Sequence, residues 1–286
     1  MHRTDRLGGI GRATAALAVV VTAGAGWATP AAADPVGIET AATTSTPASF
    51  DRTINTPCPA GKVVTGGGAY LTLSTAAQGH VGLDRHEPRA NGRGFTAGMR
   101  EAGAADYTDD WQMTTLAVCA PQPTGYQVVA TTGAAGTEYV TASCGTKSVI
   151  GVGARVNSGF GNVLLDQVVP SADLKSVTAR AVVVQGGAAA GWSLTTFAVC
   201  ASAPAGLERI SLAPAYASDS HQLTITSCPD GKALYSAGAD IGAGNGQVLL
   251  SGVNMTAGDT VRVWADEDAD GTAGTWNLVA YGICGS

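Results

Sequence analysis

Two histidines and an aspartate stand at alternating positions in one short segment, His80-Val-Gly-Leu-Asp84-Arg-His86. If this segment is a β-strand, the three side chains point to the same face, because successive residues of a strand alternate between its faces. Two imidazoles and a carboxylate on one face could bind zinc or another divalent ion, or could supply a general acid and a general base. A solvent-exposed strand edge followed by an acidic loop would contain the same residues, and we favour that interpretation.

A second acidic pattern, Asp266-Glu-Asp268-Ala-Asp270-Gly, has the alternating carboxylates and the glycine with which a calcium-binding loop begins. Asp266, Asp268 and Asp270 are therefore candidate ligands of a weak Ca²⁺ site. Asn277 stands where such a loop would close with a bidentate glutamate, and no flanking helices are predicted. A solvated acidic hairpin is therefore the favoured interpretation, and no other cofactor is expected.

Common catalytic motifs are missing from the sequence, which has no Gly-x-Ser-x-Gly, no His-Glu-x-x-His and no phosphate-binding loop. We therefore expect a secreted, non-enzymatic binding protein or a protein associated with the cell envelope. An extracellular hydrolase or lyase with its site in the first third of the chain, using His80, Asp84 and His86, is the first alternative. A purely structural secreted protein is the second.

The first 33 residues have the pattern of a signal peptide. Three arginines precede an apolar run over residues 13–27, and Ala31-Ala-Ala33 matches a cleavage site. We predict cleavage after Ala33 and a secreted, extracellular protein. The formal net charge of −6 argues against nucleic acid as a partner, since phosphate binding requires clustered basic residues. No later segment is apolar enough to span a membrane.

The rest of the chain repeats one motif three times. Each copy opens near a cysteine and a lysine, continues through a Gly-Ala pair, and closes with a segment that runs from tryptophan to cysteine: WQMTTLAVC, WSLTTFAVC and WNLVAYGIC. We place the β-repeats at residues 35–121, 122–203 and 204–286. Short β-branched runs between turn residues predict five or six strands in each repeat, and no window has capped helical periodicity, so the expected fold class is all-β.

All six cysteines lie after residue 33, and their even number predicts three disulfides in an oxidising compartment. Two pairings respect the repetition. One closes a ring between repeats, through Cys119–Cys144, Cys200–Cys228 and Cys58–Cys284. The other joins the first and last cysteine of each repeat, as Cys58–Cys119, Cys144–Cys200 and Cys228–Cys284. We favour the second pairing, because each duplicated unit then carries its own cross-link.

The closing segment of each repeat is apolar on both faces near its cysteine. Trp111 and Cys119 share one face, and Val118 lies on the other. Because both faces would then be covered, we expect three disulfide-linked repeats of about 80 residues packed with pseudo-threefold symmetry, as in a β-prism. Tandem small sandwiches are the alternative. Trp111, Trp192 and Trp276 are expected in the core rather than as sugar-stacking platforms.

Cys-Pro-x-Gly-Lys, followed by Gly-Gly-Gly-Ala and a tryptophan strand that ends Ala-Val-Cys-Ala, resembles a tandem repeat in proteins of unknown function that bacteria secrete. This resemblance covers nearly the whole chain after the signal peptide and implies export and β-structure. The threefold repetition also resembles, faintly, the β-prism of vitelline membrane outer layer proteins, although their acidic motif after the glycine strand is not matched. That second resemblance implies a carbohydrate-related role, so the expected partner is an extracellular polysaccharide or a cell-wall component.

Overall fold

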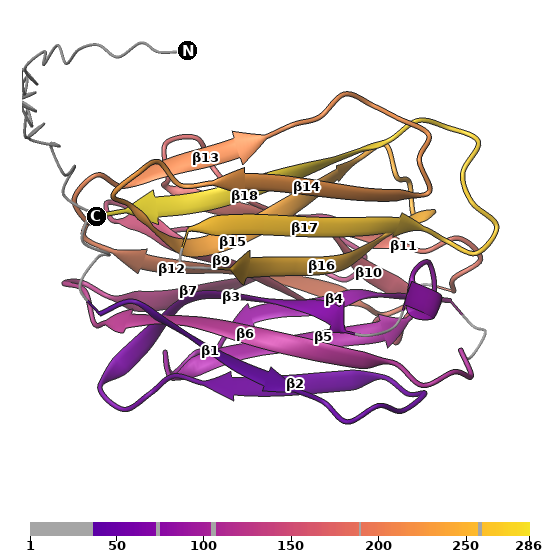
Figure 1. Cartoon of the computed structure of the whole chain (residues 1–286), viewed down its shortest axis with the longest axis horizontal. Coiled ribbons are helices and arrows are strands. Elements are labelled where there is room, and N and C mark those ends of the chain that lie inside the picture. Colours follow the sequence, from indigo (N-terminus) through magenta and orange to yellow (C-terminus); the bar gives the residue numbers. More distant parts are fainter. Residues whose placement is uncertain (1–36, 73–74, 104–106, 189, 257–258) are drawn as a thin grey trace, which may run out of the picture. The chain divides into compact units, whose positions relative to one another are not determined.

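A computed structural model describes residues 37–72, 75–103, 107–188, 190–256 and 259–286. The predicted signal peptide, residues 1–33, lies outside this part. Within the described residues the protein is all-β, as predicted, with eighteen strands, one short 3₁₀ turn and no α-helix (Figure 1). No helix in these segments is long and apolar enough to cross a membrane.

The strands fall six to a repeat. Those of repeat 1 are β1 (Glu39–Thr44), β2 (Arg52–Pro57), β3 (Lys62–Thr72), β4 (Val81–Pro88), β5 (Gly94–Glu101) and β6 (Gln112–Pro121), with the 3₁₀ turn η1 (Thr75–Ala77) after β3. Those of repeat 2 are β7 (Gln127–Thr132), β8 (Tyr139–Ser143), β9 (Ser148–Asn157), β10 (Val163–Pro170), β11 (Ser176–Val183) and β12 (Ser193–Ala201). Those of repeat 3 are β13 (Glu208–Leu212), β14 (His221–Ser227), β15 (Ala233–Gly242), β16 (Val248–Thr256), β17 (Thr260–Glu267) and β18 (Asn277–Gly285).

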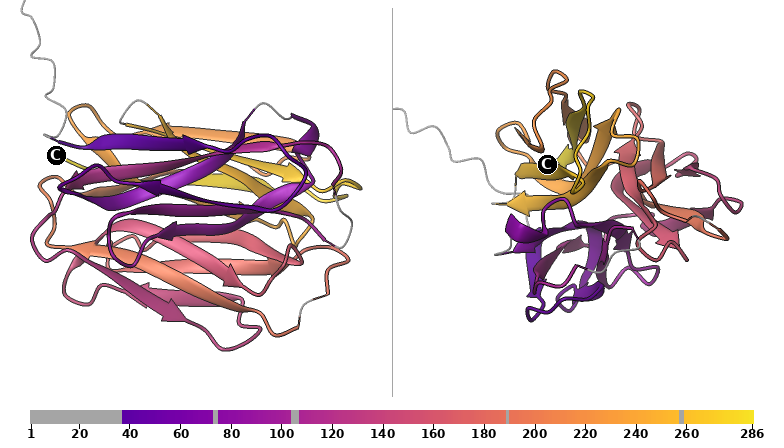
Figure 2. Two further views of the ribbon diagram at one scale, coloured as in Figure 1. Left: turned by 90° about the horizontal axis from the view of Figure 1, so that it is seen from below. Right: turned by 90° about the vertical axis from the view of Figure 1, so that its right-hand side faces the viewer.

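Each sheet takes three strands from one repeat and three from another. Sheet I has the order β1-β6-β3-β16-β17-β14, sheet II the order β2-β5-β4-β9-β12-β7, and sheet III the order β13-β18-β15-β10-β11-β8. The repeats are therefore joined by main-chain pairing and arranged about a common axis (Figure 2, right). Of the two expected arrangements, the structure has the packed threefold one and not the tandem sandwiches.

The repeated Gly-Ala pair lies where two repeats meet. A Cβ atom on Gly68 would lie 2.1 Å from the carbonyl oxygen of Val253, and one on Gly238 would lie 2.1 Å from that of Val168. Any larger residue would force the neighbouring strand away, so glycine is required by close backbone approach. The alanine after Gly68, Ala69, is fully buried and pairs with Val253 across the junction of β3 and β16.

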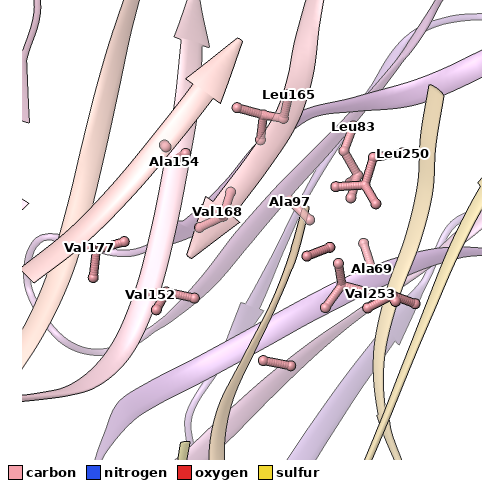
Figure 3. Packing of buried hydrophobic residues seen from close by; sticks show 14 of the residues in the cluster. Ala69, Leu83, Ala97, Val152, Ala154, Leu165, Val168, Val177, Leu250 and Val253 are labelled. Atoms are coloured by element: carbon pink, nitrogen blue, oxygen red, sulfur yellow. The ribbon is translucent and has the colours of Figure 1, made fainter. Parts of the chain in front are cut away.

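The core lies between the three sheets and is filled mainly by alanine and by branched aliphatic side chains. Figure 3 shows Leu83, Leu165 and Leu250, one from each repeat, pointing into it together with Ala69 and Val253. These side chains are almost completely excluded from solvent. The predicted burial of the three repeated tryptophans is confirmed, since their exposed fractions are 1%, 4% and 0% for Trp111, Trp192 and Trp276.

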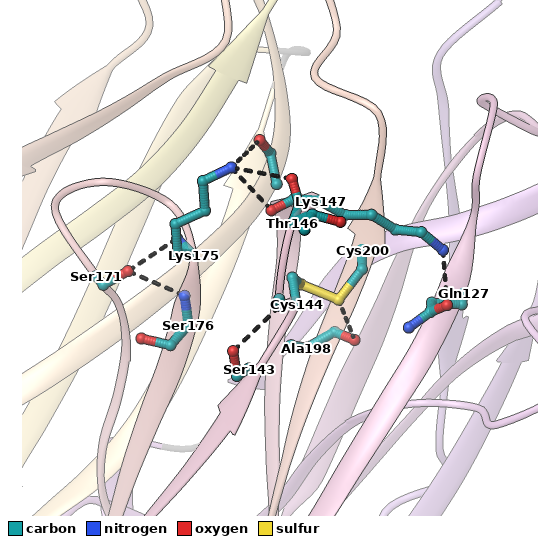
Figure 4. The surroundings of a disulfide bond; sticks show 12 residues. Gln127, Ser143, Cys144, Thr146, Lys147, Ser171, Lys175, Ser176, Ala198 and Cys200 are labelled. Atoms are coloured by element: carbon teal, nitrogen blue, oxygen red, sulfur yellow. Dashed lines mark hydrogen bonds between the residues drawn. A yellow bond between two sulfur atoms is a disulfide. The ribbon is translucent and has the colours of Figure 1, made fainter.

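Three disulfides cross-link the repeats internally. They join Cys58 to Cys119, Cys144 to Cys200 and Cys228 to Cys284, with Cα atoms 5.5–5.8 Å apart, which is normal disulfide geometry. Figure 4 shows the second of them beside Lys147, whose Nζ donates to Gln127 Oε1 at 2.7 Å. The matching lysines form ion pairs, Lys62 with Glu39 and Lys232 with Glu208, both at 2.9 Å. We call this region, where each repeat has its disulfide and its paired lysine, the disulfide end.

Two β-bulges recur in each repeat. One lies in the middle strand, where the pairing register skips Asp84 in β4, Asp166 in β10 and Ser251 in β16. The other lies in β3, β9 and β15, at Thr65, Ile150 and Tyr235. A bulge inserts one extra residue and therefore reverses the alternation of faces beyond it. This reversal decides where the side chains of β4 point.

Candidate functional site

The loops opposite the disulfide end differ among the repeats. We call this region the tryptophan end, because Trp111, Trp192 and Trp276 lie there at the start of the closing strands. Its backbone is shared between neighbours: Gly103 N donates to Gly161 O at 3.0 Å, from repeat 1 to repeat 2, and Gln185 N donates to Gly246 O at 2.9 Å, from repeat 2 to repeat 3. Loops that make similar main-chain hydrogen bonds therefore differ in their side chains.

A pocket of about 570 Å³ opens at the tryptophan end where repeat 1 meets repeat 2. Phe50 and Phe160 contribute to its lining and are 62% and 74% exposed. We call it the aromatic pocket, and it is lined by Ser49, Phe50, Asp51, Glu101, Gly103, Tyr107, Thr108 and Phe160. Two large exposed aromatic side chains thus line one pocket, and clustered exposed apolar surface marks interaction sites more often than single exposed residues do.

The backbone of Phe160 is unusual. Its φ angle is +47°, in the left-handed region, which is unfavourable for a bulky side chain. The matching residue of repeat 3 is Asn245, with a φ of +50°, and asparagine tolerates this conformation. Each is followed by a glycine, Gly161 and Gly246. The loop geometry is thus common to two repeats, and only repeat 2 uses it to hold an aromatic ring in solvent.

Two carboxylates of the aromatic pocket are held in place by hydrogen bonds. Asp51 accepts from Arg100 Nη1 at 2.9 Å and from the main-chain N of Glu101 at 3.0 Å. Glu101 in turn accepts from Trp111 Nε1 at 3.2 Å and from Tyr107 N at 3.1 Å. Phe50 is also held, because the guanidinium of Arg52 lies 5.0 Å from its ring centre. The pocket therefore presents positioned aromatic rings beside positioned acceptors.

A second pocket, of about 450 Å³, lies where loops of all three repeats meet. We call it the axial pocket. Leu164, Val184 and Leu249 form a small buried cluster there. Repeat 1 has Gly82 where the other repeats have leucine, and a Cβ at Gly82 would lie 2.7 Å from Leu164 Cδ1. A third leucine would not fit, so the threefold pattern is broken at this point.

The polar side chains of the axial pocket come from three repeats. The ring of His80 stacks on Tyr107, with centres 4.7 Å apart, and Gln185 Nε2 donates to Asp270 Oδ2 at 3.3 Å. Burial and, after it, the hydrogen bond with Asp270 together raise the pKa of Asp268 to about 6. Tyr107 lines both pockets, so they are neighbours.

The predicted convergence of His80, Asp84 and His86 on one strand face is wrong. The bulge at Asp84 breaks the period-two pattern, so His86 faces the core, where its Nε2 lies 3.2 Å from Ala237 O. Asp84 is 5% exposed and pairs with Arg100 at 2.8 Å. His80 precedes the strand and lies in the axial pocket. The three side chains thus occupy three separate environments.

Burial also sets the ionisation of these groups. It lowers the pKa of His86 to about 4, so this histidine is neutral near pH 7. Burial raises the pKa of Asp84, and the hydrogen bond and charge of Arg100 oppose that rise. Neither group is placed to exchange protons with a ligand in the pockets.

The candidate calcium ligands also separate. Asp266 is 2% exposed and accepts from His221 Nδ1 at 2.5 Å, whereas Asp268 and Asp270 line the axial pocket. Over the described segments, no group of three or more His, Cys, Asp or Glu side chains is arranged to hold a metal ion.

Sequence reasoning did not single out Phe50, Tyr107 or Phe160. A usable signal was present for Phe160, which stands between two glycines where repeat 3 has Asn245 between Gly244 and Gly246. An aromatic residue in a turn sequence that another repeat fills with asparagine is a departure that the fold does not require.

No protein-family model matches this chain, and no curated protein is significantly similar to it.

Proposed function

We propose that this protein is a secreted, non-enzymatic binding protein that recognises an extracellular glycan through the aromatic pocket. The observation that carries the proposal is Phe160, a ring held 74% exposed on a strained left-handed backbone. Strain of this kind persists where the surrounding structure imposes it, and it is concentrated at functional sites. A purely structural role does not require an aromatic residue here, since repeat 3 has Asn245 in the same conformation.

The chemistry of the pocket suits a sugar. Pyranose rings have apolar C–H faces and hydroxyl edges, and they are bound by aromatic rings next to fixed hydrogen-bonding groups. Phe50 and Phe160 supply the rings, Asp51 and Glu101 supply the acceptors, and Thr108 supplies a hydroxyl group. A cell-wall component or an extracellular polysaccharide is the expected source of this ligand.

The arrangement favours binding over catalysis. Asp51 already accepts hydrogen bonds from Arg100 and from a main-chain amide. Glu101 already accepts hydrogen bonds from Trp111 and from the main-chain N of Tyr107. The hydrolase or lyase alternative depended on His80, Asp84 and His86, which lie apart. The three disulfides are compatible with an oxidising extracellular compartment, and secretion with cleavage after Ala33 remains part of the proposal.

Retention on insoluble polysaccharides and binding to a glycan array test this function. Phe160→Asn places in repeat 2 the residue that repeat 3 already has, so we expect an intact fold and affinity lower by about tenfold, the loss of one good aromatic contact. Tyr216→Ala, at a surface tyrosine outside both pockets, is the control and should bind like the wild type. Absence of glycan binding by the wild type would contradict the proposal, as would full binding by Phe160→Asn.

A further inference from the structure

Sheet I has an aromatic pair on its outer face. Tyr70 of β3, Gly252 of β16 and Trp264 of β17 stand directly opposite one another in the strand register. Their strand neighbours Ala69 and Val263 are buried in the core, so alternation places Tyr70 and Trp264 on the opposite, outer side. Their ring centres are 5.9 Å apart and their planes differ by 34°. We call these three residues the outer platform.

Gly252 lets the indole lie across the sheet. A Cβ at this position would lie 2.7 Å from Cε3 of Trp264 and 3.0 Å from Cβ of Tyr70. A residue with a side chain would push both rings away from the backbone of β16. The glycine therefore forms the floor under the pair, and the rings extend over three neighbouring strands rather than standing apart.

The same row in the other two sheets is charged. Sheet II has Arg155, Arg85 and Gly98 at the positions of Tyr70, Gly252 and Trp264. Sheet III has Asp240, Gln167 and Arg180 there. Because the fold accepts charged residues at these positions, the aromatic row is not needed to build the sheet.

The exposure of Trp264 sets it apart from the other tryptophans. Trp111, Trp192 and Trp276 are buried, whereas Trp264 is the one partly exposed tryptophan in the described part of the chain. Leu223 extends the row on β14 and is 45% exposed. Arg262 lies two residues from Trp264 on the same face of β17, exposed to solvent, where its guanidinium can donate to hydroxyl groups.

We propose that the outer platform is a second carbohydrate subsite, which stacks an uncharged sugar ring on Trp264 and Tyr70. Two facts favour such an occupant. The row itself is uncharged, unlike its two equivalents, and its rings are braced by the sheet, so little conformational entropy is lost on binding. This inference rests on the proposed glycan function but concerns a different surface of the protein.

The test uses the full secreted chain with its disulfides and a panel of cellohexaose, laminarihexaose and chitohexaose. Acrylamide quenching of tryptophan fluorescence reports on Trp264, because the other described tryptophans are buried. We expect the bound oligosaccharide to lower the quenching constant about twofold. Trp264→Arg, which copies Arg180 of repeat 2, should lower affinity about tenfold, and Trp264→Phe should lower it less. Circular dichroism and thermal unfolding check that both variants are folded.

Comparison with Phe160→Asn separates the two proposals. Weaker binding by both variants supports both sites. If Phe160→Asn binds weakly while Trp264→Arg binds normally and quenching is unchanged, the outer platform is not a subsite and the aromatic pocket stands. If Phe160→Asn binds normally and Trp264→Arg binds weakly, the outer platform is supported and the aromatic pocket is not a glycan-binding site. Failure of the wild type to bind any member of the panel, or any polysaccharide in the retention assay, overturns both.

Discussion

The two ends of this protein differ in how closely the three repeats agree. At the disulfide end all three repeats have the same parts: a disulfide, a turn lysine and a partner for that lysine on the first strand of the repeat. At the tryptophan end the main-chain contacts recur, but Phe160, His80 and Asp268 have no counterparts of the same type. The repeated residues therefore maintain the scaffold, and specific chemistry is found where one copy departs from the others.

Removing a disulfide is the strongest way to test the scaffold side of this comparison. Cys144→Ala combined with Cys200→Ala opens a loop with a sequence separation of 56 residues. The unfolded chain then regains conformational entropy, and we expect the free energy of unfolding to fall by about 4 kcal/mol. Urea denaturation measures it. Glycan affinity of the folded variant should not change, and a matching loss of affinity would show that the two ends are coupled.

The core between the ends contains a departure that can titrate, His86, where the other repeats have Val168 and Val253. Its folded-state pKa of about 4 lies below the ordinary 6.5, so as the pH falls the unfolded chain takes up the proton first. The stability that is linked to neutral His86 is fully present above pH 6.5. About 3 kcal/mol of the free energy of unfolding is lost between pH 6.5 and pH 4. His86→Val should therefore become more stable relative to the wild type by that amount on acidification.

Urea denaturation of both proteins at pH 7 and pH 4 gives this difference. The two proteins are compared because a second group acts in the opposite direction in both of them. Burial raises the pKa of Asp166 to about 7, so protonation of this carboxyl stabilises the fold as the pH falls. His80→Asn is the control. It replaces a partly exposed histidine by the residue that repeat 2 has at the matching position, and its stability should change with pH as that of the wild type does. Parallel pH profiles for His86→Val and the wild type would refute the effect.

Replacing Phe160 at the tryptophan end should have opposite effects on stability and on glycan binding. Phe160→Asn relieves the left-handed strain, so we expect the free energy of unfolding to rise by about 1 kcal/mol while affinity falls. Thermal unfolding measures the first effect, and polysaccharide retention measures the second. A variant that is both less stable and weaker in binding would mean that Phe160 belongs to the scaffold.

The smallest effect is expected at the turn lysines. Lys62→Ala breaks the ion pair with Glu39 at the surface, and we expect a loss of less than about 1 kcal/mol that shrinks further at high salt. Unfolding at low and high ionic strength checks this, and glycan binding should be unchanged. A larger loss would show that the disulfide end depends on its ion pairs as well as its disulfides.

Local patterns in the sequence were sufficient for much of the scaffold. Strand-forming runs, the even cysteine count and the tryptophan positions predicted the all-β repeats and the burial of Trp111, Trp192 and Trp276. The formation of each sheet from three strands of one repeat and three of another was not predictable. Residues as distant in sequence as Tyr70 and Gly252 pair there, and no local sequence pattern indicates such pairing.

The candidate site was harder to predict for two physical reasons. One extra residue, Asp84, reversed the face of His86, and alternation alone cannot reveal a bulge. The aromatic residues of the pocket come from separate loops, so no single motif contains them. Trp264 was within reach of the sequence, since the matching residues are Gly98 and Arg180, and an unmatched tryptophan among three matched ones is a clear departure.

The shared sheets also make the covalent order of the repeats unimportant for holding the structure together. Every repeat pairs with both others, and β3 of the first pairs with β16 of the last, so the hydrogen-bonded circuit is closed. A protease that cuts the connection at residues 122–126 would nick the chain without releasing a repeat, since each repeat remains hydrogen-bonded to two neighbours. We therefore expect the three repeats to unfold together rather than one at a time.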